Sequence, residues 1–77
     1  MPEKLYLVQR ETLDEYGDVV DSRDLLTCDT YDYARDFVGR SIMDFPLEDN
    51  EQISISAVEE TDGEIDYENA DLLWVSI

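Results

Sequence analysis

The chain has 77 residues, and its 21 Asp and Glu residues against 5 Lys and Arg give a formal net charge of −16 at pH 7. A chain of this length holds one domain, so residues 1–77 are expected to form a single unit with a small core. A charge of this sign and size argues against direct binding to DNA, RNA or an anionic membrane. Apolar residues make up 43% of the chain, which favours a folded domain over a disordered polyanion.

The only cysteine is Cys28, so the chain cannot form an internal disulfide. The first residues, Met1 to Lys4, lack the basic and then apolar segments of a secretory signal. Apolar runs elsewhere are far shorter than a membrane span. We therefore expect a cytoplasmic protein that does not contact membranes.

The first third of the chain predicts a β-hairpin. An apolar run at 5–8 opens a strand that extends towards Leu13. Residues 14–18 carry the Asp and Gly residues that are typical of a hairpin tip. A return strand begins at Val19 and ends near Thr27.

A helix is predicted from about residue 30 to residue 43, and Pro46 follows its end. Asp29 or Thr30 is the expected N-cap, and Asp32 in the first turn suits the helix dipole. The spacing of the less polar residues predicts one buried face. That face consists of Ala34, Phe37, Val38, Ser41, Ile42 and Phe45.

Two strands are predicted in the second half. Residues 53–58 alternate as a half-buried strand does, and Asp62-Gly63 marks a turn. Residues 72–77 are so apolar that we expect them in the sheet interior, because an exposed edge of this kind would aggregate. The fold class is therefore α+β, with a four-stranded antiparallel sheet, one helix packed on one face and the order β-β-α-β-β.

Neither catalysis nor a metal site is expected. The chain has no His, and Cys28 or a serine would need a base and an orienting group beside it. Pairs of neighbouring carboxylates arise by chance among so many acids. The acidic turns at 14–18 and 60–64 lack the ligand spacing of a calcium-binding loop. We expect a protein that is not an enzyme and that needs no cofactor.

One acidic pattern is more regular than chance predicts. In an extended segment, acids at every second position point to one side at intervals of about 6.6 Å. Such a row is similar to the phosphates of a nucleic acid. Two alternatives remain. In the first, the acids form the solvated outer face of a hairpin, and the turn at Gly63 breaks the row in two. In the second, they belong to an acidic, lysine-poor surface adapted to high salt. The alternating residues are Glu60, Asp62, Glu64, Asp66 and Glu68.

Further acids, Asp29, Asp32 and Asp36, are expected on the exposed part of the helix. Together with the acidic row, they make the chain resemble, at class level, the small acidic inhibitors of phages and mobile elements. Anti-CRISPR proteins and other DNA mimics belong to this class. The resemblance implies binding to a host nuclease or nucleoprotein at its nucleic-acid groove, and a location in the host cytoplasm if a phage encodes the chain.

The expected function is that of a noncatalytic protein-binding domain, an inhibitor that occupies a basic nucleic-acid-binding surface of another protein. The alternative is an acidic adaptor or small subunit that binds a basic partner without mimicry. In either case Tyr31, Tyr33 and Tyr67 are candidate anchors, because binding energy concentrates in Tyr, Trp and Arg. Ordinary half-buried packing is the alternative for each tyrosine. The oligomeric state is left open.

Overall fold

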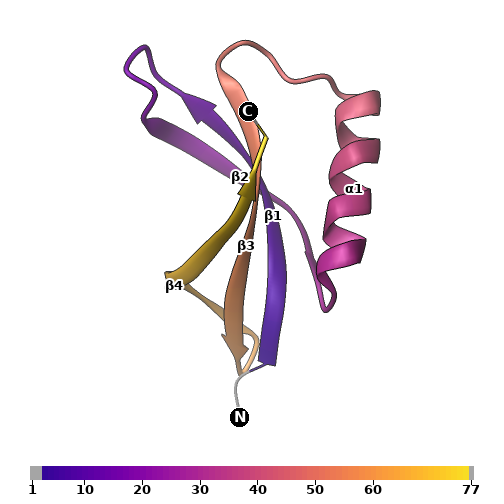
Figure 1. Cartoon of the computed structure of the whole chain (residues 1–77). Coiled ribbons are helices and arrows are strands. Elements are labelled where there is room, and N and C mark those ends of the chain that lie inside the picture. The colour runs from indigo at the N-terminus through magenta and orange to yellow at the C-terminus, as the bar shows by residue number, and fades with distance from the viewer. Residues whose placement is uncertain (1–2, 77) are drawn as a thin grey trace.

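The computed structural model describes residues 3–76. Four strands form one antiparallel sheet in the order β2-β1-β3-β4, and a single helix lies on one of its faces (Figure 1). The predicted α+β class and the order β-β-α-β-β are confirmed. The elements are β1 (Glu3–Leu13), β2 (Val19–Cys28), α1 (Tyr31–Asp44), β3 (Glu51–Thr61) and β4 (Glu64–Val75).

The ends of α1 follow from local chemistry. Thr30 is the N-cap, and its hydroxyl accepts the backbone N–H of Tyr33 at 3.3 Å. This bond satisfies one of the free donors of the first turn. At the other end, the N–H of Phe45 donates to the carbonyl of Ser41 at 2.8 Å. The helix lies over β1, β2 and β3.

A small apolar cluster joins the helix to the sheet. All of its members are at most 2% exposed. The helix contributes Ala34 and Val38, which lie one turn apart. The cluster is Val8, Ala34, Val38, Ile53 and Ile55. Phe37 and Ile42 are only half-buried at its margin. The predicted helix face is therefore confirmed at its centre.

Phe45 was expected on this face, but its side chain is 69% exposed. The helix ends at Asp44, and Phe45 leaves the helical conformation with φ −133° and ψ 82°. The i, i+4 spacing predicts a shared face only while the helix continues. The prediction for Phe45 was therefore wrong.

The face of the sheet away from the helix is covered by a bulge in β4. Opposite β3, the partner of Ala57 is Asp71 and the partner of Glu59 is Asp66, so residues 67–70 bulge out of the strand. From this bulge Tyr67 donates its hydroxyl to Asp24 of β2 at 2.6 Å. The hydrogen bond links the two outer strands across the sheet, and residues 53–58 of β3 are consequently buried on both faces.

The C-terminal apolar run was predicted in the sheet interior, and this prediction was wrong. Residues 72–75 of this run belong to β4, which lies at an edge of the sheet and begins at Glu64, and Ile77 lies outside the described residues. The interior positions are taken by β1 and β3, whose central residues are the more deeply buried ones. Among residues 3–76, β4 pairs with β3 alone, so no strand of this part of the chain lies on its outer side.

Candidate partner-binding surface

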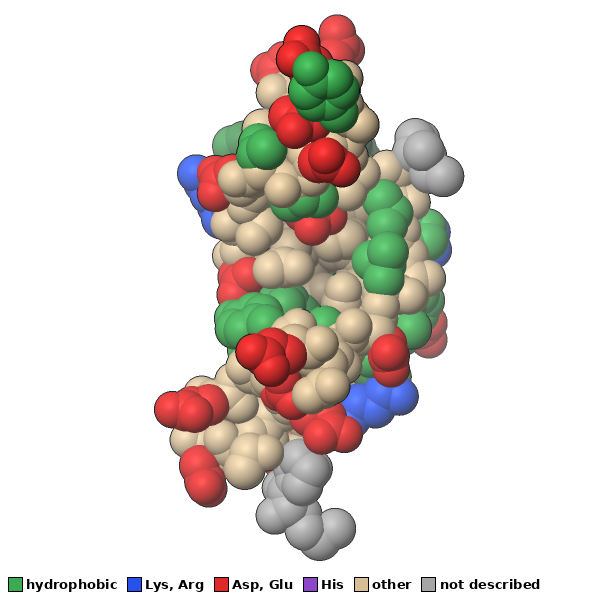
Figure 2. All heavy atoms as spheres, turned by 90° about the vertical axis from the view of Figure 1, so that its left-hand side faces the viewer, with side chains coloured by type: hydrophobic (Ala, Val, Ile, Leu, Met, Phe, Trp, Pro, Cys, Tyr) green, Lys and Arg blue, Asp and Glu red, His purple; other side chains and the backbone are tan. Residues whose placement is uncertain are grey.

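The structure gathers acids at the two ends of the molecule. The β1–β2 and β3–β4 hairpin tips lie at opposite ends, and the N-terminal end of α1 points towards the β3–β4 tip (Figure 1). Side chains of Asp and Glu mark both ends of the face away from the helix (Figure 2). We call the surface around the β3–β4 tip the acidic end. It comprises Glu3 of β1 and Glu59, Glu60, Asp62, Glu64 and Asp66 of the hairpin, together with Asp29 and Asp32 at the helix start.

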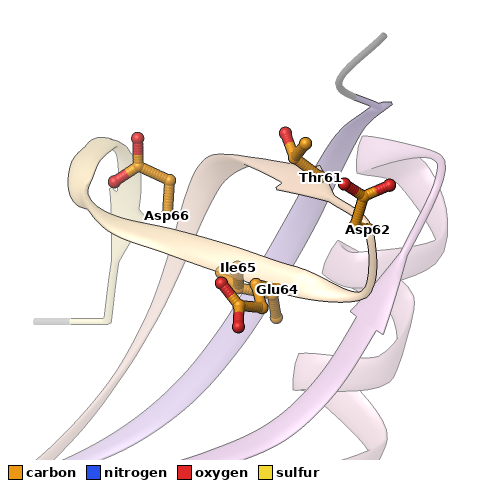
Figure 3. A pocket seen from close by; sticks show the side chains of 5 residues that line it. All are labelled: Thr61, Asp62, Glu64, Ile65 and Asp66. Atoms are coloured by element: carbon orange, nitrogen blue, oxygen red, sulfur yellow. The ribbon is translucent and has the colours of Figure 1, made fainter.

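The alternating acids do not form one straight row. In the register of the hairpin Glu60 lies opposite Ile65, whereas Glu59 lies opposite Asp66. Because neighbouring residues of a strand point to opposite faces, Glu60 and Asp66 lie on different faces of the hairpin. The carboxylates of Glu64 and Asp66 point away from each other beside an open hollow at the tip (Figure 3). The charge therefore surrounds the hairpin.

The remaining two members of the predicted row lie outside regular strand structure. Asp62 occupies the turn with a φ of 53°, in the left-handed region that Asn and Asp tolerate. Glu68 belongs to the bulge, where its backbone N–H donates to the carboxylate of Asp66 at 3.2 Å. Glu68 therefore lies away from the tip itself.

Asp66 also has a local structural role. Its carboxylate accepts hydrogen bonds from the side-chain amide of Asn69 at 2.7 Å and from the backbone N–H of Asn69 at 3.4 Å. The Asn69 side chain is the main cause that holds the pKa of Asp66 below its usual value. Asp66 therefore stabilises the bulge that covers the second face.

Like charges lie directly opposite each other at the acidic end. Glu3 is the cross-strand partner of Glu60, and Glu59 is the partner of Asp66. The one basic side chain in this register is Lys4, opposite Glu59. Directly opposed like charges destabilise a sheet. Glu3 and Glu59 were not predicted as members of the site, because only the register of the strands brings them to it.

The basic side chains do little to compensate the acids. Within residues 3–76, only two of the acids form side-chain salt bridges: Glu51 with Arg10 at 2.8 Å and Asp36 with Arg40 at 3.0 Å. The Arg35 guanidinium lies over the Trp74 ring at 4.4 Å. Asp36, expected at the site, is thus already paired in an exposed i, i+4 contact, whereas Asp29 and Asp32 lie at the start of the helix.

This uncompensated charge predicts that added salt stabilises the domain. Screening weakens repulsion between exposed carboxylates, and the Debye length falls from about 10 Å at 0.1 M to about 3 Å at 1 M. We expect Tm to rise when NaCl is increased over this range. Thermal melts followed by circular dichroism measure the effect, and a Tm that falls with salt would contradict it.

The three candidate anchor tyrosines differ in their exposure and in the contacts they already make within the fold. Tyr31 is half-buried, packs edge-to-face on Tyr6 with ring centroids 6.0 Å apart, and is held in the fold. Tyr67 is exposed at its ring, but its hydroxyl is bound to Asp24, which raises the pKa of Tyr67. Tyr33 is exposed on α1, beside a groove that Phe37 and Phe45 also line. Tyr33 is therefore the most available anchor of the three.

The described residues do not form a nucleophilic or metal-binding site. The thiol of Cys28 donates to the carbonyl of Thr30 at 3.2 Å. In the part of the chain that the structure describes, residues 3–76, no three His, Cys, Asp or Glu side chains are grouped so that they could hold a metal ion. The surface offers charge and contact area, which are properties used in binding.

Among residues 3–76, the structure contains no helix with the length and apolar character needed to cross a membrane. Comparisons of the chain with protein-family models, curated proteins and solved structures found no match. The function is therefore inferred from the charge and shape of the surface.

Proposed function

We propose that the chain is a noncatalytic protein-binding domain that inhibits a partner by occupying its basic, nucleic-acid-binding surface. The observation that supports this proposal is the pairing of like charges, Glu3 with Glu60 and Glu59 with Asp66, at the acidic end. Such pairs oppose folding. A benefit outside folding, namely attraction of a basic groove, accounts for their presence.

The arrangement suits a groove lined by Lys and Arg. Carboxylates on both faces of the β3–β4 hairpin let basic side chains contact it from two sides, as they contact the two strands of a duplex. Asp29 and Asp32 extend the charge towards the helix. Pairing with a cationic partner would also relieve the repulsion within the hairpin, so binding and stability would rise together.

The alternative, an acidic adaptor that binds a basic partner without mimicry, is favoured by a different observation. Large apolar side chains, among them Phe45 after the end of α1 and Leu72 in β4, are exposed and are not members of the acidic end. An adaptor would depend on such contacts more than on charge.

A pair of charge-matched variants tests the proposal. The first changes Glu59→Gln, Glu60→Gln, Asp62→Asn and Glu64→Gln, and leaves Asp66 in place because it holds the bulge. The control removes four acids near the opposite end, with the substitutions Glu15→Gln, Asp18→Asn, Asp21→Asn and Asp44→Asn. Both variants keep the shape of the side chains and change the net charge equally.

The binding partner is recovered on the immobilised domain from a nuclease-treated lysate, and its affinity for each variant is then measured. We expect the first variant to lose at least about tenfold in affinity, equivalent to about 1.4 kcal/mol, and the control to lose much less. Duplex DNA or RNA should displace the domain from the partner. Retained binding by the first variant, together with indifference to nucleic acid, would leave the adaptor as the better explanation.

A further inference from the structure

The C-terminal part of β4 exposes two large apolar side chains at an edge of the sheet. Leu72 is 63% exposed and Leu73 is 46% exposed, and no strand among residues 3–76 lies on the outer side of β4. The helix covers β1, β2 and β3 and leaves β4 largely uncovered. Figure 2 shows hydrophobic side chains between the two acidic ends on the face away from the helix. Leu72 and Leu73 are not members of the acidic end.

The backbone of this edge is free to pair. An edge strand directs about half of its N–H and C=O groups outward, and natural proteins usually protect such edges with Lys, Pro, charges or bulges. β4 contains neither Lys nor Pro. The residue paired with Ile55 is Trp74 and the residue paired with Ser56 is Leu72, so Leu73 is an extra residue that bulges. Leu72 and Leu73 remain exposed at this bulge, which is separate from the one at residues 67–70.

The other edge strand, β2, is better protected. Its outer half contains Asp21, Arg23 and Asp24, all exposed. Charged side chains on an edge oppose the addition of a further strand. The exposed Val19 and Val20 of β2 are followed directly by these charged residues, whereas residues 72–75 of β4 form an uncharged stretch.

The charge of the chain identifies the kind of strand that fits. β4 continues from the apolar stretch into acids, with Asp71 beside Leu72 and with Glu68 in the bulge. A second copy would bring another net charge of −16 to this edge. A cationic segment gains Coulomb attraction where a second copy meets repulsion.

We propose that the edge of β4 from Asp71 to Val75 binds an extended segment of a partner protein as a fifth strand. The segment carries apolar side chains that pack on Leu72 and Leu73 and Lys or Arg side chains that face Asp71 and Glu68. Backbone hydrogen bonds supply affinity, and the alternating side chains supply specificity. The inference rests on the proposed function only for the positive charge of the partner.

The test uses a synthetic peptide of alternating lysine and valine, about ten residues long, which is near the upper length of ordinary strands. Its control is the same peptide with every second backbone nitrogen methylated, so that charge is kept and backbone donors are lost. Affinities are measured by calorimetry, and the binding position by amide hydrogen exchange. We expect the methylated peptide to bind at least about tenfold more weakly. We also expect the unmodified peptide to protect amides of β4.

Two variants locate the interaction. Leu72→Lys places a basic side chain on the edge and should lower the affinity for the unmodified peptide at least about tenfold. Val20→Lys introduces a lysine at an exposed position of β2 and should lower this affinity much less. Thermal melts of both variants show whether each is folded.

Equal affinity for the two peptides, or full binding by Leu72→Lys, would overturn the inference. So would a dimer of the free domain in sedimentation that Leu72→Lys dissociates, because the edge would then bind a second copy. The acid-to-amide variant tests the other proposal separately. Loss of binding in Leu72→Lys with retained partner binding in the amide variant would keep the fifth strand and reject mimicry.

Discussion

Ile55→Ala is expected to lower the free energy of unfolding by about 2–5 kcal/mol, the usual cost of truncating a fully buried aliphatic side chain. Ile55 is 0% exposed and lies in the sheet between Val8 and Trp74, its cross-strand partners. It belongs to the cluster that also contains Ala34 and Val38 of the helix. A cavity here therefore weakens the contact between helix and sheet.

The size of the core makes this loss severe. Small domains have a total stability of about 5–15 kcal/mol. Five residues form the buried cluster between the helix and the sheet. Repulsion among the surface acids lowers the stability further. Urea denaturation followed by circular dichroism measures the change, and we expect the midpoint to fall with an unchanged slope.

The matched control is Val20→Ala in β2. Val20 is also an aliphatic strand residue, but its side chain is 61% exposed. Its truncation should change the free energy of unfolding by no more than about 0.5 kcal/mol. Equal losses in the two variants would show that the core is not organised around Ile55.

The elements specified by local signals were predictable. The first hairpin follows from Asp and Gly residues at 14–18, where Asp14 accepts the N–H groups of Tyr16 and Asp18, both at 2.9 Å. The helix start follows from Thr30, one of the two expected caps. Such features depend on residues a few positions apart, and the sequence displays them directly.

The path of β4 was not predictable in the same way. Asp66 and Asn69 hold its bulge locally, but the attachment of the bulge to β2 depends on Tyr67 and Asp24, which are 43 residues apart in the chain. Its place at the edge depends on β1 and β3 filling the interior. No local pattern in residues 64–75 contains this information, so the apolar run alone suggested an interior strand.

The candidate site was predictable in composition and not in geometry. The acids at Glu60, Asp62 and Glu64 lie together at one hairpin tip, as their proximity in the sequence implies. Which face each one occupies depends on strand register, and a shift of one residue reverses every side chain. The opposed pair of Glu59 and Asp66 exists only because of this register.

Arg10 joins the end of the helix to the sheet, and its ion pair with Glu51 makes this contact dependent on pH. Arg10 of β1 binds Glu51 of β3 with two hydrogen bonds, at 2.8 and 3.0 Å. The same guanidinium donates to the carbonyls of Phe45 at 2.9 Å and Pro46 at 3.1 Å, just after α1. Arg10 thus holds the segment that follows the helix against the strands.

The hydrogen bond from Arg10 is the main reason that the pKa of Glu51 falls from 4.5 to about 2. A pKa that is lower in the folded state means that the ionised carboxylate stabilises the fold. This contribution is fully present above pH 4.5, the unfolded value, and is lost as the pH falls through the folded value of about 2.

Glu51→Gln removes the charge and keeps one acceptor for Arg10, so the variant is expected to have the lower Tm at neutral pH. The Tm difference from the unmodified chain should stay constant down to pH 4.5 and then shrink as the pH approaches 2. Because the other acids titrate in both proteins, comparison of the two melts largely removes the general effect of acid. Asp36→Asn is the control, since it breaks the exposed pair with Arg40 and such pairs contribute little. A difference for Glu51→Gln that persists unchanged at pH 2 would show that the ion pair with Arg10 is not its cause.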